Sequence, residues 1–431
     1  MQQRLSSTLK GFDRPFWVAN VSEIFERLSY YAVFSTLALY LNQTLGFPSA
    51  QAAGLSGIFG GAVWVMAIFG GALADRIGFR RALSSAYFIL TCAYFLVGSI
   101  GAPWLAPVRA VIPLPLLAGI ILFLPALGVA LVKPSVVGTT ARASKESVRS
   151  IGYAIYYTMV NIGSTLGPFL AGWLHSRLPA QDVFMIAACS VFLMFIVVLV
   201  FFREPRTGAA SSSKSLAQTG RDFLTVLSNG RFVLFLLIFS GYWIVYWQQY
   251  LILPIYINQY VDKNANTALI LITDPLIVIT LTVAINTFTR AMRPFQALVV
   301  GTLITSVAWL LIPAHPSVLM AVLSLAVVAI GEIVQSPRYY EYISRLAPEG
   351  QQGTYMGFAF LPIGIGSLAG GWFGGTLLSR FGEGSHQPSM IWLVITGTGL
   401  LTTVLLWLYD RYALRAGVAQ VTPAGTEQVV P

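Results

Sequence analysis

The sequence predicts an all-α membrane protein with twelve transmembrane helices arranged in two six-helix halves. Three observations support this prediction. Of the 431 residues, 56% are hydrophobic and only 10% are charged, whereas a soluble domain carries about a quarter charged residues. The apolar residues form long runs separated by short turns, and most runs reach the ~20 residues that a membrane-spanning helix needs. Basic residues gather in alternate loops, which is typical of polytopic membrane proteins.

The apolar runs form two sets with a polar segment between them. The first six runs lie near residues 16–41, 51–75, 80–100, 112–140, 150–175 and 181–203. The second six lie near residues 230–260, 265–289, 294–313, 316–345, 352–380 and 388–413. The intervening stretch RTGAASSSKSLAQTGRD is polar and rich in Ser and Gly, which is typical of a linker. We therefore expect a six-helix bundle at 1–203, a cytoplasmic linker at 204–229, a second six-helix bundle at 230–413 and a disordered cytoplasmic tail at 414–431.

The net charge of +10 is explained by where the basic residues lie. In the first half they fall in alternate loops, as Arg4, Lys10 and Arg14, then Arg76, Arg80 and Arg81, then Arg142, Lys145 and Arg149. This positive-inside pattern predicts a multi-pass protein of the inner (cytoplasmic) membrane with both termini in the cytoplasm. A nucleic-acid-binding protein would instead gather its basic residues on one solvated face. We expect a lipid bilayer and no nucleic acid as partner.

A loop motif joins the second and third predicted helices. Residues 71–81 read GALADRIGFRR, and this pattern resembles the loop signature of the major facilitator superfamily. The small residues Gly70 and Gly71 let neighbouring helices approach closely. We assign Asp75 and Arg76 to a cytoplasmic gate; an ordinary basic turn is the alternative interpretation. In the fold that the resemblance implies, the two halves rock about a binding site at their interface near the membrane midplane.

The first predicted helix carries a cluster of charges, in the stretch EIFERLSYY at residues 23–31. Glu23, Glu26, Arg27, Tyr30 and Tyr31 are linked by steps of three or four, so the polar set faces one side of the helix. Two carboxylates beside one guanidinium leave one negative charge uncompensated, which a proton or another cation should balance. Such clusters inside membranes are usually functional, and we assign the proton to the coupled pair and not to either Glu alone. An ion-pair network that only ties the first helix to the fourth is the alternative.

Three further segments, taken with the first helix, resemble the signature of the proton-coupled oligopeptide transporter family. Lys133-Pro134 lies in the fourth helix, and YTMVNIGS at 157–164, ending at Pro168, lies in the fifth. GEIVQSP at 331–337 lies in the tenth helix and is followed by LAP at 346–348 and YMG at 355–357. The resemblance spans most of the chain.

The resemblance implies a role for each matched residue. Glu23 and Glu26 would couple protons, and Arg27 and Lys133 would receive the carboxylate of a peptide. Asn161 and Glu332 would hold the peptide amine. This division is physically reasonable, because a zwitterion is held well between a positive pole on one half and a negative pole on the other, and Arg suits a carboxylate through its fork of donors. Aromatic residues expected to line the pocket are Tyr30, Tyr31 and Trp64, with ordinary packing as the alternative.

Two positions depart from the family pattern. The seventh helix of the family carries an acid where this chain has Gln248, and the eighth carries Asn-Pro where this chain has Asp274-Pro275. We expect Gln248 and Asp274 to contact the substrate. Our hypothesis is that Asp274 supplies the negative pole or second proton site that the seventh helix lacks. The alternative is that Asp274 caps the break at Pro275 or faces the outer water.

Taken together, these features predict a proton-coupled symporter that takes up di- or tripeptides, or related zwitterionic or carboxylate solutes, by alternating access. The proton is the coupling ion, no other cofactor or metal is expected, and the protein is expected to be a monomer. The alternative function is a proton-linked major facilitator exporter of drugs or amphipathic metabolites, which would not need Lys133 and Glu332 as opposed poles. A receptor that has lost transport is disfavoured by the retained charges. An enzyme is not expected, since no nucleophile–base set is found.

Overall fold

The computed structural model describes residues 11–205, 216–346 and 352–414, and its regular elements within these ranges are all helices. This follows from the composition, because a chain in lipid must pair its own backbone N–H and C=O groups. Ten helical segments of the described residues are long and apolar enough to cross a membrane.

The first half consists of six long helices. They are α2 (Arg14–Leu39), α3 (Ser49–Ile77), α4 (Phe79–Ser99), α6 (Leu114–Arg142), α7 (Arg149–His175) and α8 (Ala180–Phe201). Between them lie short segments, η1 (Tyr40–Thr44), η2 (Pro103–Leu105), α5 (Ala106–Val111) and η3 (Glu146–Val148).

The second half follows α9 (Leu216–Ser228), an amphipathic helix that occupies the later part of the predicted linker. Its elements are α10 (Gly230–Tyr246), α11 (Gln248–Leu251), α12 (Leu253–Tyr260), α13 (Thr267–Leu271), α14 (Thr273–Thr289), α15 (Pro294–Ala308), α16 (Leu311–Ala314), α17 (Val318–Leu346), α18 (Gln352–Phe358), α19 (Leu361–Leu377), η4 (Leu378–Gly384), α20 (Ser389–Leu408) and η5 (Tyr409–Leu414). Most of the predicted tail lies outside the described residues.

Four runs predicted as single helices are interrupted. The breaks separate α10 from α11 and α11 from α12, α13 from α14, α15 from α16, and α18 from α19. Proline lies in the first turn of the helix after four of these breaks, as Pro254, Pro275, Pro313 and Pro362. Proline lacks the N–H that would bond to the preceding turn, so it favours the start of a helix. It is not excluded from membrane helices, and Pro125, Pro134, Pro168 and Pro337 lie inside the long helices.

Two long helices are not among the ten apolar ones. α2 has 26 residues and α7 has 27, and α2 includes the charged residues Glu23, Glu26 and Arg27. Counting these two helices as spans would give the predicted twelve.

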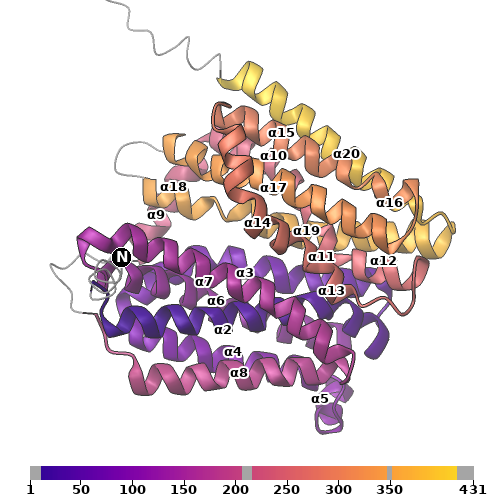
Figure 1. Cartoon of the computed structure of the whole chain (residues 1–431). Helices are drawn as coiled ribbons and strands as arrows, with labels where there is room; N and C mark the ends of the chain where they lie inside the picture. Colours follow the sequence, from indigo (N-terminus) through magenta and orange to yellow (C-terminus); the bar gives the residue numbers. More distant parts are fainter. Residues whose placement is uncertain (1–10, 206–215, 347–351, 415–431) are drawn as a thin grey trace, which may run out of the picture.

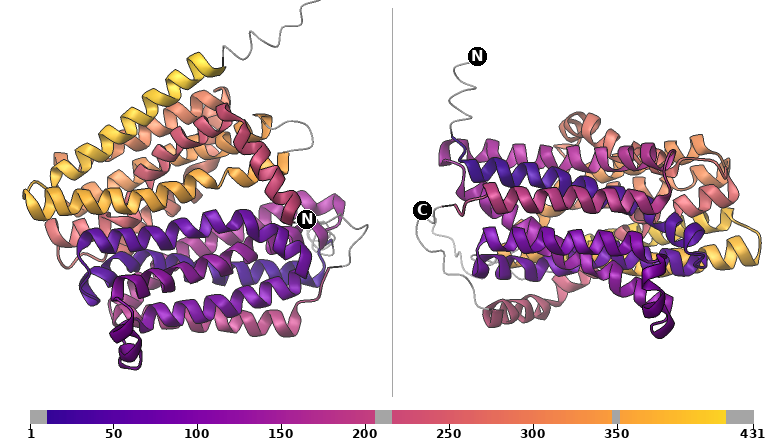
Figure 2. Two further views of the ribbon diagram at one scale, coloured as in Figure 1. Left: turned by 180° about the vertical axis from the view of Figure 1, so that it is seen from behind. Right: turned by 90° about the horizontal axis from the view of Figure 1, so that it is seen from below.

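The helices form two bundles that lie against each other, α2–α8 in one and α10–α20 in the other (Figures 1 and 2). Between the bundles α3 packs along α19, and α7 contacts α13 and α14. α9 and α18 lie at one end of the molecule, at the left of Figure 1. We call this end, where α2 begins and α6 finishes at Arg142, the basic end.

At the opposite end the two bundles are joined by hydrogen bonds from neutral side-chain donors. Asn266 Nδ2 donates to the Gly172 carbonyl at 2.8 Å, and Gln43 Nε2 donates to Asn258 Oδ1 at 3.2 Å. Ser49 Oγ donates to Glu383 Oε1 at 2.5 Å. Toward the basic end α14 turns away from α7 (Figure 1), and only 22% of an 18-residue window within the span 267–289 is buried. The two bundles therefore touch at one end and separate along α7 and α14 at the other.

The contact between α3 and α19 depends on glycine at both surfaces. A Cβ added to Gly371 would lie 2.6 Å from the Ala53 carbonyl oxygen and 3.0 Å from the Gly57 Cα. A Cβ on Gly61 would lie 2.7 Å from the Gly364 carbonyl oxygen. Because these neighbours are backbone atoms, they cannot move aside without separating the helices, as at other small-residue interfaces between membrane helices.

Gly371→Val is therefore expected to push α3 and α19 apart. It should lower the free energy of unfolding by about 1–3 kcal/mol, as in other overpacked interiors, and so lower the melting temperature. Gly397→Val is the matched control, since a Cβ there would meet nothing within 4 Å. The measurement is the melting temperature of both variants in detergent. Equal melting temperatures would show that the close contact does not stabilise the protein.

Candidate functional site

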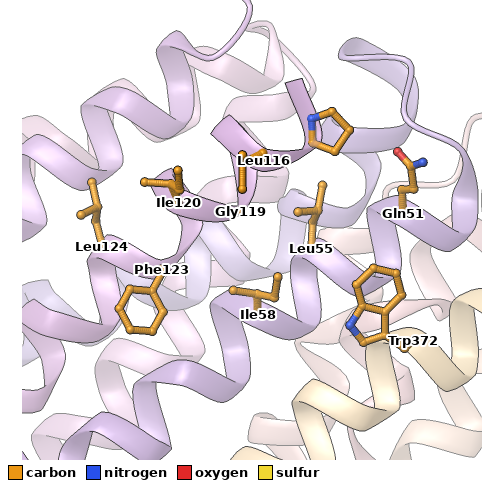
Figure 3. A pocket seen from close by; sticks show the side chains of 10 residues that line it. Gln51, Leu55, Ile58, Leu116, Gly119, Ile120, Phe123, Leu124 and Trp372 are labelled. Carbon is orange, nitrogen blue, oxygen red and sulfur yellow. The ribbon is translucent and has the colours of Figure 1, made fainter. Parts of the chain in front are cut away.

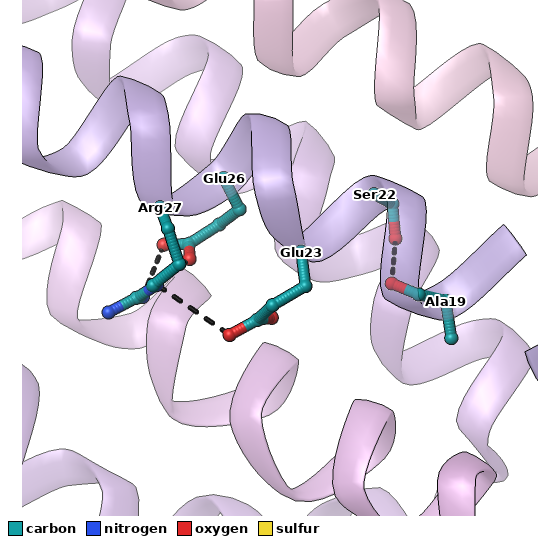
Figure 4. Close-up of polar contacts among 5 residues, drawn as sticks. All are labelled: Ala19, Ser22, Glu23, Glu26 and Arg27. Atoms are coloured by element: carbon teal, nitrogen blue, oxygen red, sulfur yellow. Dashed lines mark hydrogen bonds and ion pairs between the residues drawn. The ribbon is translucent and has the colours of Figure 1, made fainter. Parts of the chain in front are cut away.

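The charged cluster of α2 is buried and self-paired (Figure 4). The side chains of Glu23 and Glu26 are 0% exposed and that of Arg27 is 2% exposed. Arg27 Nη2 donates to Glu26 Oε1 at 2.6 Å, and its Nε donates to Glu26 Oε2. Arg27 Nε also lies 3.6 Å from Glu23 Oε1. The fork of one guanidinium is thus occupied by one carboxylate, while the second carboxylate remains at longer range.

α7 approaches α2 beside this cluster because it has glycine where the helices cross. A Cβ on Gly163 would lie 2.6 Å from the Ile24 carbonyl oxygen and 2.7 Å from the Arg27 Cβ. Gly163 belongs to the YTMVNIGS segment, so its structural role is to let α7 pack closely at Arg27. The Tyr30 ring lies 5.1 Å from the guanidinium carbon, which adds a cation–π contact to the ion pairs.

Lys133 of α6 lies in an aromatic environment. Its Nζ is 3.6 Å from the centroid of the Trp64 ring and 5.9 Å from that of Phe360, which comes from the other half. The Trp64 and Phe360 rings are stacked at 5.7 Å. No ion pair of Lys133 within 4 Å is seen among the described residues. The ammonium group is therefore held against ring faces, at a contact between the two halves.

Aromatic side chains connect the halves next to these charges. The Tyr31 ring on α2 lies 6.4 Å from that of Tyr250 on α11, and Phe34 stacks on Tyr250 at 4.9 Å. Phe34 also lies 5.6 Å from Trp247. Tyr31 interacts electrostatically with Arg27 on its own helix and with Asp274 and Glu332 of the second half. Tyr31 therefore lies between the charges of the two halves.

The second half carries an acidic pair with a tyrosine between its members. Tyr246 of α10 places its hydroxyl 3.1 Å from Asp274 Oδ2 and 3.0 Å from Glu332 Oε2. Gln249 Nε2 lies 3.4 Å from the same Asp274 oxygen. Asp274 is 3% exposed, and its Oδ1 has no hydrogen-bond partner in the described part of the chain. Asp274 therefore faces the interior and does not face the outer water.

The structure places Gln248 differently from our expectation. Its Nε2 donates to the Gly370 carbonyl at 3.1 Å and to the Ile244 carbonyl at 2.6 Å. A Cβ on Gly374 would lie 2.2 Å from Gln248 Oε1. Gln248 thus packs α11 onto α19, and the glutamine that reaches Asp274 is its neighbour Gln249. The reason is geometric, since adjacent residues on a helix point about 100° apart.

Tyr246 and Gln249 are the site residues that the sequence interpretation missed. A signal for them exists, because Tyr242, Tyr246 and Gln249 are separated by four and three residues and so share one face. The Tyr242 hydroxyl is buried on the same face. Gln248 lies off this stripe.

Other predicted site residues lie outside the two charged groups. Asn161 Nδ2 donates to the Tyr157 carbonyl of its own helix at 2.8 Å. Arg76 is exposed in the last turn of α3, and the side chain of Asp75 is outside the described residues. Glu204, which the sequence interpretation did not single out, accepts from the backbone N–H groups of Phe79 and Arg80, both at 2.8 Å. It caps α4 and ties the loop to the end of α8.

An apolar groove of about 660 Å³ lies away from these charges (Figure 3). It is lined by residues of α3 and α6 with Trp372 of α19, and Gln51 is its only polar side chain. It contains none of the predicted site residues, so we do not take it as the substrate site. The described residues contain no cluster of three or more His, Cys, Asp or Glu that could hold a metal ion.

Arg27→Met is expected to destabilise the protein more than Glu26→Gln. The first change leaves two buried carboxylates without a cation, which costs about 3–5 kcal/mol for a broken buried pair, whereas the second leaves Glu23 beside Arg27. The double variant Glu26→Gln/Arg27→Met should recover part of the loss. The measurement is the melting temperature of all three variants in detergent. A double variant that melts no higher than Arg27→Met would contradict the pairing of Arg27 with Glu26.

Proteins similar to this chain are known over most of its length. The chain is 23% identical over 386 residues to "Multidrug resistance protein MdtH" of Escherichia coli, covering 89% of this chain and 91% of that protein. A "POT family transporter in complex with 5-aminolevulinic acid" superimposes with a TM-score of 0.74 at 17% identity, covering 93% of this chain and 99% of that one. The nucleoside transporter NupG superimposes with a TM-score of 0.75 at 12% identity, covering 91% and 99%.

These likenesses confirm the all-α membrane fold of the major facilitator type, and the resemblance to the peptide transporters holds at the level of the fold. The related proteins and structures are transporters, so the chain is a multi-pass membrane transporter and not an enzyme. The model of the "Major Facilitator Superfamily" matches residues 20–289, more than half of the sequence, and the chain therefore belongs to the major facilitator superfamily.

Proposed function

We propose that the protein is a proton-coupled symporter that takes up a small zwitterionic solute, with dipeptides as the leading substrate class. The supporting observation is the position of Tyr31 between two groups of charges on opposite halves. Arg27 and Lys133 form the positive pole, and Glu332 with Asp274 forms the negative pole. The carboxylate of a zwitterion would bind the first pole and its ammonium group the second. Such a ligand would draw the halves together.

The charges also suggest how a proton is coupled. A proton on the Glu23/Glu26 pair would weaken the hold of Glu26 on Arg27 and free its fork of donors for the substrate carboxylate. Proton and solute are then coupled because both favour the same change of conformation. We assign the basic end to the cytoplasm. The structure then corresponds to a state closed toward the outside, in which α7 and α14 separate toward the inside.

Export of cationic, amphipathic compounds is the second candidate function. One observation favours it specifically, because the fork of Arg27 is occupied by Glu26 whereas Asp274 and Glu332 have no cation within 4 Å among the described residues. A solute with an amine and no carboxylate would pair with these two acids and would not need the positive pole formed by Arg27 and Lys133. The name of the MdtH relatives, as multidrug resistance proteins, agrees with this candidate.

The test is uptake of labelled dialanine into proteoliposomes with and without an inward proton gradient. We expect gradient-driven uptake by the unmodified protein. Glu26→Gln should abolish the dependence on the gradient, because it removes a carboxyl group that binds the coupling proton. Glu146→Gln is the matched control, since Glu146 is an exposed carboxylate outside the site.

Dialanine uptake that is equal with and without the gradient would contradict proton coupling. If dialanine is not taken up, the same proteoliposomes are loaded with ethidium, and its efflux is followed on acidifying the opposite side. Efflux that depends on Glu332 would then favour export over symport. If neither uptake nor efflux is observed, both candidate functions are excluded.

A further inference from the structure

The Tyr246 hydroxyl lies between two carboxyl groups and has only one proton to donate. Its oxygen is 3.1 Å from Asp274 Oδ2 and 3.0 Å from Glu332 Oε2, and both distances are those of hydrogen bonds. The two carboxyl groups also lie within hydrogen-bonding reach of each other. A hydroxyl can donate to one carboxylate, and a second contact is favourable only if the other carboxyl group carries a proton and donates in return.

The surroundings of the pair supply no charge that could replace this proton. The titratable groups that face it are tyrosines: Tyr31 of α2, Tyr242 and Tyr246 of α10, Tyr250 of α11 and Tyr340 of α17. Gln249 adds a neutral amide donor. No Lys or Arg lies within 4 Å of either carboxylate in the described ranges. Two like charges this close inside a low-dielectric interior repel strongly.

We propose that Asp274 and Glu332 share one proton across the Tyr246 hydroxyl, and that the ammonium group of the transported solute takes the place of this proton. In the exchange the carboxylic O–H bond breaks and its proton leaves to water. The ammonium N–H groups then donate to the two carboxylates. The pair carries a net charge of −1 when it holds a proton and also when it holds an ammonium group. Because the charge of the site is unchanged, the exchange avoids the electrostatic cost of uncovering a second buried charge.

This inference rests on the proposed function only in that the solute carries an amine. It also predicts the class of ligand that the second half selects, namely a primary ammonium group with at least two N–H donors. A quaternary ammonium ion has no N–H and would not satisfy the two carboxylates and the Asp274 Oδ1 atom, which lacks a hydrogen-bond partner in the described part of the chain. In transport, the proton of the Asp274/Glu332 pair would move in the direction opposite to the amine. The protons of the Glu23/Glu26 pair on α2 would move in the same direction as the amine.

The shared proton is tested first without any ligand, on the full chain in lipid nanodiscs, by infrared spectroscopy of the carboxylic-acid C=O stretch during a pH titration. We expect the carboxylic-acid absorption to contain a band that is absent from Asp274→Asn/Glu332→Gln, distinct from the absorption of a proton on the Glu23/Glu26 pair. In Tyr246→Phe the band should keep its amplitude but move in frequency, because the hydrogen bonds of the tyrosine hydroxyl with the two carboxyl groups are lost. Glu146→Gln should leave the band unchanged.

A double variant that retains the whole band would show that the pair is fully ionised and would overturn the inference. A band that does not move in Tyr246→Phe would show that the tyrosine does not bridge the shared proton, and would also overturn it.

The exchange is tested on the same band with methylammonium chloride, using tetramethylammonium chloride at equal concentration as control. We expect methylammonium to remove the band and to release about one proton per protein into a weakly buffered solution, as the exchange of one ammonium for one proton requires. Tetramethylammonium should do neither. A band unaffected by methylammonium at saturating concentration would refute the exchange. Because no peptide is used, this result is independent of whether dialanine is a substrate.

Discussion

The cost of keeping charge inside a membrane is the constraint on which the rest of this structure depends. In the first half the cost is met locally, since Arg27 is enclosed by Glu26 and Glu23 and Lys133 rests on the ring of Trp64. The helices are arranged to make this possible. Gly163 lets α7 press against α2 at Arg27, and a Cβ at that position would meet the Ile24 carbonyl oxygen at 2.6 Å. A small residue is thus needed beside the buried charges, as it is at the contact of α3 with α19.

The contacts that close the molecule at the end opposite the basic end are of a different kind. Asn266, Gln43 and Ser49 donate across the halves from neutral amide and hydroxyl groups. A hydrogen bond between neutral groups contributes only about 0.5–1.5 kcal/mol, and the one from Ser49 to the carboxylate of Glu383 about 1.5–3 kcal/mol. They can open at small cost, and their amide donors do not respond to protonation. In the transport mechanism proposed above, the energy that decides between conformations would come from the charges near the middle of the interface. The glycine contact of α3 with α19 is a close-packed surface between the halves.

The sequence allowed some parts of this picture to be predicted and not others, for physical reasons. The shared face of Glu23, Arg27 and Tyr30 could be predicted because it depends only on the period of one helix. The partner of Lys133 could not be predicted, because Trp64 and Phe360 come from other helices and a cation can bind either an acid or an aromatic face. Gln248 was placed in the site by its position in a family motif, whereas the stripe of Tyr242, Tyr246 and Gln249 turns it toward α19. The break before Pro254 was overlooked because hydropathy is continuous across it, whereas the break at Pro275 was considered only as the alternative role of Asp274.

The net charge of the site sets how many bound protons would make it neutral for each kind of solute. Arg27 and Lys133 contribute +2, and the four carboxylates Glu23, Glu26, Asp274 and Glu332 contribute −4. One proton on each acidic pair brings the site to zero, which is the least costly state for crossing the membrane. If an amine cation replaces the proton of the second pair, the total stays at zero. If a zwitterion replaces it, the total falls to −1, and neutrality returns only when both Glu23 and Glu26 are protonated. Under the proposed function, uptake of a dipeptide would therefore require two protons on α2, whereas an amine without a carboxylate would require one. The fold alone allows both solutes, and the electrostatic balance at these six residues decides between them.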